Sequence, residues 1–424
     1  MNNNLTKDNV FFIFVFCIIS FSFLLNIYFN YFLKLSGDEG IYYALSVGQE
    51  IDDNLFLPGF SYYLSFLNNI FFLSNFGFLK IAVTAINYLL IAFILYKFHL
   101  YRLKIPSLIL CTVLLSPTYF YFLSSLWADT FSTLLFCSEL ILLVRFFGKE
   151  TLTKFILIVI IASFLTLLRP QYFFFIAILS IYYFFYLFKN KSNLLKKIVL
   201  WIVSNIIIFS PILYLCILNY LTYGAFIPVI SPLVAELFFY PSKEFIEIAS
   251  TSTALSFYDC KQYIILFAEA NELTFYEAAN VLTEKYSIKN SSDFINISLN
   301  NLYTFFWGEK YLFLERYTFL FCWGKSDCIF RDYTILLYFI EMIIRILFII
   351  ILIVIVAWPL FKKIDMHIYL YFISILIIFV SLHCFGGNPT HGRYIFQFYP
   401  IVFLFFAIFF SISKEKMKTQ LTLE

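Results

Sequence analysis

The sequence contains few charged residues. Only 13% of its 424 residues are Asp, Glu, Lys or Arg, against about 25% in a typical soluble domain. This shortage excludes an ordinary soluble globule, because 62% of the residues are hydrophobic and one globule of this size cannot bury so much apolar surface. Lipid must cover part of it. The composition therefore predicts an integral membrane protein.

Sequence patterns for a structural zinc site are also missing. The eight cysteines form no CxxC pair, and no HExxH sequence occurs. Cys322 and Cys328 flank a short polar loop, so a disulfide between them is an open alternative. Four other cysteines lie in apolar runs, where the residue usually serves as a small hydrophobic side chain: Cys17, Cys111, Cys137 and Cys216.

No internal repeat and no soluble domain can be recognised, so we expect residues 1–424 to form one domain. About 20 apolar residues are needed to cross a bilayer core of roughly 30 Å. By this measure the sequence predicts an all-α integral membrane protein, a polytopic bundle of about ten transmembrane helices. The expected spans are 11–32, 78–97, 105–123, 128–146, 155–168, 171–188, 198–219, 333–357, 366–384 and 394–412. The first lacks a signal-peptide cleavage site, so we expect it to be retained.

The basic residues predict the orientation of these helices. Sixteen of the 29 Lys and Arg residues lie in short segments on one side, among them Lys196, Lys197 and three lysines after the last span. The positive-inside rule makes this side cytoplasmic. Both termini are then cytoplasmic, and the longer segments 33–77 and 220–332 are external loops. We expect a cell membrane protein, by default of the bacterial cytoplasmic membrane, with the endoplasmic reticulum as an open alternative.

Both external loops carry helical signals. Thr274 and Glu277 have the spacing of a capping box before an apolar stretch. In the first loop, aromatic and aliphatic residues recur at roughly helical spacing, which predicts an amphipathic helix lying along the membrane surface. These residues are Tyr62, Tyr63, Phe66, Ile70 and Phe71.

Charged residues near the external ends of the spans are candidates for chemistry. Asp38 and Glu39 follow the first span directly, and adjacent carboxylates can act as a general base or hold a divalent cation. Asp129 begins the fourth span, where it is either a site residue or a helix N-cap. Arg169 lies at a short helical hairpin, where an arginine usually faces a polar cavity and pairs with an anion. Arg393, where the last span begins, has either the same role as Arg169 or that of a membrane anchor.

Other charged residues have a structural interpretation. Glu50, Asp52 and Asp53 are explained more simply as solvated loop residues. Glu341 and Arg345, four residues apart in an apolar span, are expected to neutralise one another on one helix face. Glu139 also lies inside an apolar span.

Several of these residues form an ordered set of short motifs. The set comprises Asp38-Glu39 followed by Tyr42, Ser116-Pro117 leading to Asp129, Leu168-Arg169-Pro170-Gln171, Tyr223 to Pro228, and Arg393-Tyr394 with Pro400. In this order the chain resembles the GT-C superfamily of polytopic glycosyltransferases, in particular protein O-mannosyltransferases and bacterial enzymes that use polyprenyl-phosphate sugars. The resemblance extends from the first span to the last.

The resemblance implies a glycosyltransferase that moves a sugar from a polyprenyl-phosphate donor to an acceptor hydroxyl at the external membrane face, in surface glycan assembly or modification. Asp38 would be the catalytic base, and Glu39 would position it. Asp129 would orient the acceptor or a metal, while Arg169 and Arg393 would hold the lipid phosphate. Tyr42 and His391 complete the implied substrate-binding residues. The resemblance identifies no certain cofactor and leaves a divalent cation open, and no nucleic acid partner is expected.

The sugar and the acceptor, whether glycan, lipid or protein, stay open. A flippase or transporter of lipid-linked sugars is a rival, although the paired broken helices typical of transporters are not recognised. A surface-polysaccharide polymerase or ligase would use a similar donor, with arginines of its external loops as working residues. A structural scaffold would leave Arg169 and the acidic pair unexplained.

Overall fold

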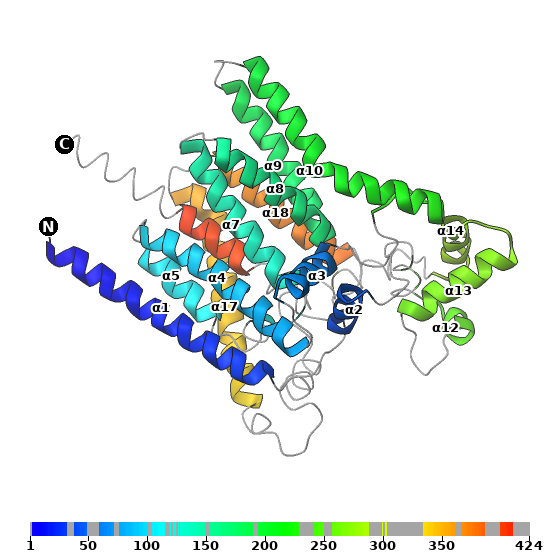
Figure 1. The fold of residues 1–424 in the computed structure, drawn as a ribbon, viewed down its shortest axis with the longest axis horizontal. Helices are drawn as coiled ribbons and strands as arrows, with labels where there is room; N and C mark the ends of the chain where they lie inside the picture. The colour runs from blue at the N-terminus through cyan, green and yellow to red at the C-terminus, as the bar shows by residue number, and fades with distance from the viewer. Residues whose placement is uncertain are drawn as a thin grey trace.

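The structure of the protein is a computed structural model (Figure 1). It describes residues 2–31, 38–48, 59–71, 76–100, 103–114, 128–148, 152–189, 194–228, 241–249, 257–287, 334–361, 366–385 and 399–409, with single residues 119, 122, 123, 126, 234, 237, 299 and 302. Secondary structure within these ranges is helical, apart from one isolated antiparallel bridge between Pro241 and Ser287. The predicted all-α class is thus confirmed for the described part of the chain.

The described helices include four that are long and apolar enough to cross a membrane: Asn9–Tyr28, Phe76–Leu100, Leu194–Tyr223 and Phe339–Leu360. Four shorter apolar helices are Phe155–Leu168, Tyr172–Ile181, Tyr369–Ser381 and Tyr399–Phe409. Every one of the ten predicted spans contains helical residues. The number of crossings stays a prediction.

The main bundle shares one hydrophobic core. Its helices are α1 (Asn2–Tyr31), α4 (Phe76–Leu100), α5 (Lys104–Leu114), α7 (Ala128–Gly148), α8 (Leu152–Leu168), α9 (Pro170–Lys189), α10 (Leu194–Tyr223), α17 (Thr334–Phe361), α18 (Met366–Phe385) and the helix Tyr399–Phe409. Cys111 and Cys137 are buried within it as small hydrophobic residues, whereas Cys17 is exposed. The predicted pair of Glu341 and Arg345 is confirmed, with Oε1 and Nε 3.6 Å apart.

A tight hairpin joins α8 and α9. The first helix ends at Leu168, Arg169 alone is non-helical, and the second begins at Pro170. Proline suits the first position of a helix, because its fixed φ is helical and no N–H is needed there. The backbone N–H of Tyr172 donates to the carbonyl of Arg169 at 3.1 Å. The predicted hairpin is confirmed, and it leaves the Arg169 side chain at one end of the bundle.

Two short helices lie at this same end, α2 (Asp38–Ser46) and α3 (Gly59–Phe71). A Cβ atom on Gly59 would lie only 2.6 Å from the carbonyl oxygen of Leu167, at the end of α8. Only glycine permits so close an approach of the two backbones. The start of α3 therefore rests on the last turn of α8, two residues before Arg169.

Gly59→Ala should lower the stability of the bundle by about 1–3 kcal/mol, because the added methyl group meets backbone that cannot move aside. Thermal unfolding in detergent would measure the change. Gly40→Ala is the matched control, since a Cβ there meets nothing within 4 Å. Alanine within the α2 helix should be neutral or stabilising by about 0.5–1 kcal/mol. Equal melting temperatures for the two variants would contradict the proposed close contact.

A second, smaller hydrophobic cluster lies beyond the end of α10 (Figure 1). It is formed by α12 (Lys243–Ala249), α13 (Phe257–Ala270) and α14 (Phe275–Tyr286). Tyr223, the last residue of α10, packs on Phe275 with ring centroids 5.4 Å apart. Gly224 then turns the chain with a φ of +73°, which favours glycine.

The predicted capping box of α14 is confirmed. The hydroxyl of Thr274 accepts from the N–H of Glu277 at 3.2 Å, and the Glu277 carboxylate accepts from the N–H of Thr274 at 2.9 Å. These hydrogen bonds, first the one from the backbone of Thr274, lower the pKa of Glu277 below its usual value. The capping carboxylate thus stabilises α14 in its ionised form.

The start of α14 should therefore loosen in acid. Because the folded pKa lies below the unfolded pKa of about 4.3, the stabilisation is complete above that pH and is lost as pH falls through the folded pKa. Hydrogen exchange over the first turn of α14, corrected for intrinsic rates, should lose protection in this range. Glu277→Gln should remove this pH dependence. Unchanged protection of the first turn of α14 in the wild-type protein at low pH would contradict the prediction.

Candidate functional site

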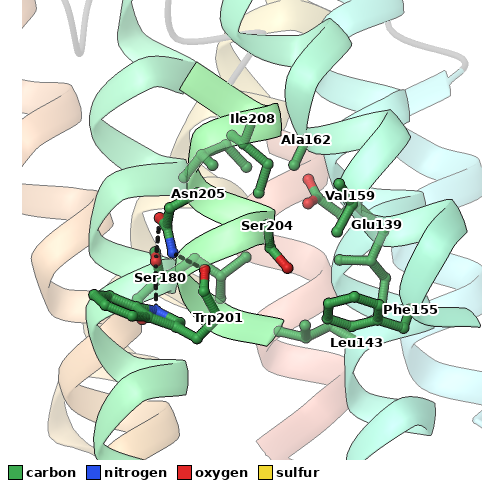
Figure 2. Close-up of a pocket in the computed structure, with 13 residues that line it drawn as sticks. Glu139, Leu143, Phe155, Val159, Ala162, Ser180, Trp201, Ser204, Asn205 and Ile208 are labelled. Atoms are coloured by element: carbon green, nitrogen blue, oxygen red, sulfur yellow. Dashed lines mark hydrogen bonds between the residues drawn. The ribbon is translucent and has the colours of Figure 1, made fainter. Parts of the chain in front are cut away.

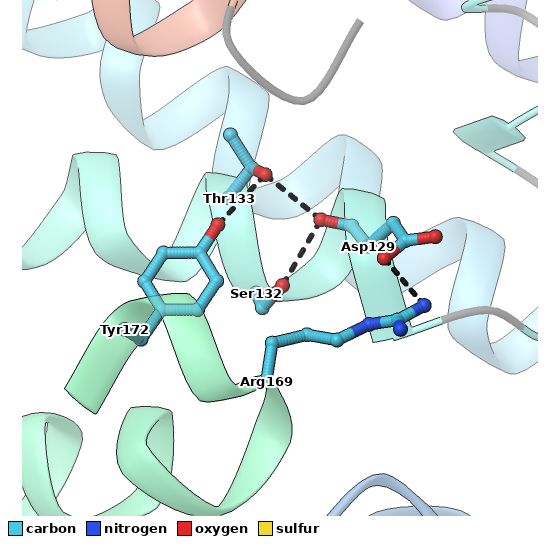
Figure 3. A network of polar contacts seen from close by, with 5 residues as sticks. All are labelled: Asp129, Ser132, Thr133, Arg169 and Tyr172. Atoms are coloured by element: carbon cyan, nitrogen blue, oxygen red, sulfur yellow. Dashed lines mark hydrogen bonds and ion pairs between the residues drawn. The ribbon is translucent and has the colours of Figure 1, made fainter. Parts of the chain in front are cut away.

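The end of the bundle near α3 contains a buried acid–arginine pair (Figure 3). Asp129 lies in the first turn of α7, and Arg169 lies between α8 and α9. A carboxylate oxygen of Asp129 is 2.5 Å from Nη2 of Arg169. The aspartate side chain is 3% exposed and that of the arginine 13%, so the positive partner is the more accessible one. Sequence reasoning singled out both residues, and the fold brings them together.

Hydroxyl groups secure the helix turns that carry this pair. The backbone carbonyl of Asp129 accepts hydrogen bonds from the hydroxyls of Ser132 at 3.0 Å and Thr133 at 2.8 Å. The Thr133 hydroxyl also lies 2.9 Å from that of Tyr172 in α9. Figure 3 shows this connection running from α7 to the turn after Arg169. The hydrogen bond between Thr133 and Tyr172 thus fixes the first turns of α7 and α9 relative to one another, next to the ion pair.

Asp129 does not act as the N-cap of α7, which was the alternative to a site residue. The residue lies inside the first turn of α7, and its carboxylate faces Arg169. Neither carboxylate oxygen accepts a hydrogen bond from the part of the chain that the structure describes, so the contact with Arg169 is an ion pair without hydrogen-bond alignment. Its negative charge is also favourable at a helix N-terminus. The carboxylate keeps capacity to accept hydrogen bonds from a ligand.

Aromatic residues of α3 pack beside the pair. Tyr63 stacks on Phe131 of α7, with ring centroids 4.2 Å apart and an interplanar angle of 9°. Phe60 lies 6.2 Å from Phe131 and contacts Tyr42 of α2 edge-on at 5.1 Å. A chain of rings therefore joins α2 to the first turn of α7. Burial raises the pKa of the Tyr63 hydroxyl well above its usual value, so this group stays neutral.

The predicted amphipathic helix in the first loop is present as α3, with one correction. Tyr62, Phe66, Ile70 and Phe71 are exposed, as expected for a face that meets a membrane surface. Tyr63 instead turns inward onto Phe131. The reason is tertiary packing, because this position of α3 faces α7 and α8, where the Tyr63 ring contacts Phe131 and Phe164.

Some of the other predicted site residues lie in the described part of the chain. Asp38 and Glu39 are the first two residues of α2. Tyr42, one turn further, is buried at 1% exposure and lies in the chain of rings described above. His391 and Arg393 lie outside the described residues, as do Cys322 and Cys328. In the described ranges no group of three or more His, Cys, Asp or Glu residues could hold a metal ion.

Sequence reasoning missed several buried polar residues. Lys80, in the second turn of α4, is only 1% exposed. Thr133 and Tyr172 connect α7 to α9, as described above. A lysine within an apolar span was a usable signal for Lys80, because such residues are rare and usually functional. Nothing in the sequence marks Thr133 and Tyr172 among the many hydroxyl residues nearby.

The fold and this site define a helical protein with membrane-compatible helices and a buried acid–arginine pair at one end of its bundle. No protein-family model, curated protein or solved structure matches this chain. Its function must therefore be inferred from its own residues.

Proposed function

We propose that this chain is a polytopic membrane glycosyltransferase of the GT-C type. It would take a sugar from a polyprenyl-phosphate donor and transfer it to an acceptor hydroxyl at the external face of the membrane. The observation that carries the proposal is the ion pair of Asp129 and Arg169, buried at the end of the bundle. The helix α2, which begins with Asp38 and Glu39, packs on α3 at the same end. The motifs shared with the GT-C superfamily support the same assignment.

The two members of the pair suit different parts of such a reaction. Arginine presents a planar set of N–H donors that matches the oxygens of a phosphate. Arg169 is the more exposed partner, so a lipid phosphate would approach it from the side away from Asp129. Asp129 would orient the guanidinium and accept a hydrogen bond from the acceptor. A divalent cation between phosphate and acid is compatible with this arrangement and is not required by it.

The proposed reaction is a direct displacement. Asp38 would accept the proton of the acceptor hydroxyl as its oxygen attacks the anomeric carbon of the sugar. The bond from that carbon to the phosphate oxygen would break, and its electron pair would leave with the polyprenyl phosphate. Arg169, together with Arg393, would stabilise the charge that develops on this leaving group. Glu39 would position Asp38, and Tyr42 would hold α2 against α3 by its contact with Phe60.

The proposed membrane arrangement follows the distribution of basic residues. Ten spans with both termini in the cytoplasm would place the α2–α3 end of the bundle outside. The exposed face of α3, with Phe66, Ile70 and Phe71, would then lie in the outer interface of the membrane. There it would stand beside a donor whose lipid tail lies in the bilayer and whose phosphate is at the surface.

The test uses the purified full chain in liposomes with a panel of radiolabelled polyprenyl-phosphate sugars. Release of polyprenyl phosphate and labelling of an acceptor by one donor would support the transferase. If no donor is consumed but one crosses the bilayer in a protein-dependent manner, the flippase alternative replaces it. Growth of a polymer on the lipid carrier would favour the polymerase alternative.

A further inference from the structure

A second polar site lies inside the bundle, about 15 Å along α7 from Asp129, since Glu139 is ten residues further on. A cavity of about 60 Å³ opens there between α7, α8, α9 and α10 (Figure 2). Its walls are mostly apolar, with residues such as Leu143, Phe155 and Ile208. A cavity of this size holds a few water molecules or a small polar group with part of a hydrocarbon chain.

Glu139 is the unusual residue of this cavity. It is 0% exposed, and neither of its carboxyl oxygens has a hydrogen-bond partner in the described part of the chain. No lysine or arginine is among the described residues that line the cavity. An ionised carboxylate without counter-ion or hydrogen bonds is very costly in such surroundings, so the group is held neutral. A neutral carboxyl group offers one O–H donor and one carbonyl acceptor.

The opposite wall carries polar side chains whose hydrogen bonds are made mostly to one another and to the backbone. The Ser180 hydroxyl donates to Asn205 at 2.6 Å, and the Trp201 indole N–H donates to Ser180 at 2.9 Å. Ser204 donates to the carbonyl of Leu200 at 2.5 Å and keeps its hydroxyl oxygen as an acceptor. Figure 2 shows the side chains of Glu139 and Ser204 reaching into the space between α7 and α10. The cavity thus presents hydrogen-bonding groups on two facing helices.

We propose that this cavity binds an uncharged membrane lipid through a hydroxyl or ester group, which receives a hydrogen bond from Glu139 and contacts Ser204. A lipid phosphate does not fit, because the lining holds an acid and no cation. The cavity is not sealed, because Phe155 of α8 and Trp201 and Asn205 of α10, which line it, are only half-buried. A hydrocarbon chain would extend outward past these residues. The site is therefore distinct in chemistry from the arginine-containing site at the end of the bundle.

The test is photo-crosslinking of the purified full chain with two diazirine probes of identical acyl chains. One is a diacylglycerol and the other is the anionic phosphatidic acid. The diacylglycerol probe should label peptides of α8 and α10 that line the cavity, and phosphatidic acid should not. Glu139→Leu should reduce this label about tenfold, from the lost hydrogen bond and the filled space. Glu139→Gln, which still donates and accepts, should retain most of it.

Controls separate binding from misfolding. Ser138→Ala changes a buried neighbour that bonds to the Leu134 carbonyl and does not line the cavity, so labelling should be unchanged. Ser204→Leu fills the cavity from the opposite wall and should match Glu139→Leu. Equal labelling by both probes, or labelling unaffected by Glu139→Leu and Ser204→Leu, would overturn the proposal. So would the absence of label on the lining peptides, which would mean that the cavity holds only water.

Discussion

Arg169→Met is expected to destabilise the protein by about 3–5 kcal/mol, because it leaves the carboxylate of Asp129 buried without its counter-charge. The aspartate side chain is only 3% exposed, so water cannot replace the guanidinium at low cost. Chemical unfolding in detergent would measure the loss. If the proposed function holds, binding of the polyprenyl-phosphate donor should also fall by at least about 100-fold, equivalent to roughly 2.7 kcal/mol of charge-assisted hydrogen bonding.

A double-mutant cycle distinguishes a coupled pair from two independent residues. Asp129→Asn removes the charge of the acid, so the double variant with Arg169→Met should be more stable than the sum of the single changes predicts. Lys196→Met, at an exposed position of α10, is the matched control for the loss of one positive charge and should change little. Additive effects at residues 129 and 169 would show that the contact contributes nothing to stability.

Asp38→Asn is expected to lower the rate of sugar transfer by about 10²–10⁴-fold, the usual contribution of a general base. Asparagine has nearly the same shape but cannot accept the proton of the acceptor hydroxyl. Donor binding should be retained, so the loss should appear in kcat and not in the affinity for the donor. Single-turnover measurements in liposomes with the accepted donor would separate the two quantities.

The neighbouring acid is the natural comparison for this variant. Glu39→Gln should have a smaller effect, since Glu39 is proposed to position Asp38 and not to take the proton. A loss of turnover in Glu39→Gln with normal turnover in Asp38→Asn would exchange the two roles. Normal turnover in both variants would remove the acidic pair from the mechanism, while leaving the ion pair of Asp129 and Arg169 as a separate question.

The two polar sites on α7 differ for a simple electrostatic reason. Asp129 has a guanidinium at 2.5 Å and lies at a helix N-terminus, both of which favour a negative charge. Glu139 lies in the middle of the same helix, with apolar neighbours and no hydrogen-bond partner in the described ranges. One helix therefore carries an acid paired with a guanidinium at its start and an acid in apolar surroundings near its middle.

Local features of this protein were determined by the sequence alone. Apolar runs predicted helices in all ten segments, because hydrophobicity and helix propensity are properties of neighbouring residues. Thr274 and Glu277 predicted the start of α14, and Pro170 predicted the break after α8. Glu341 and Arg345 pair as their spacing of four residues predicts. In each case the interacting groups are close in the chain, so no knowledge of packing was needed.

Contacts between distant segments were decided only by the tertiary structure. Asp129 and Arg169 are 40 residues apart, and their pairing depends on how α7 packs against α8 and α9. The inward turn of Tyr63 depends on the position of Phe131, and the approach of Gly59 to Leu167 depends on the docking of α3. The cavity around Glu139 exists because four helices leave space between them. Side-chain packing between helices sets these distances, and a linear pattern of residue types does not contain them.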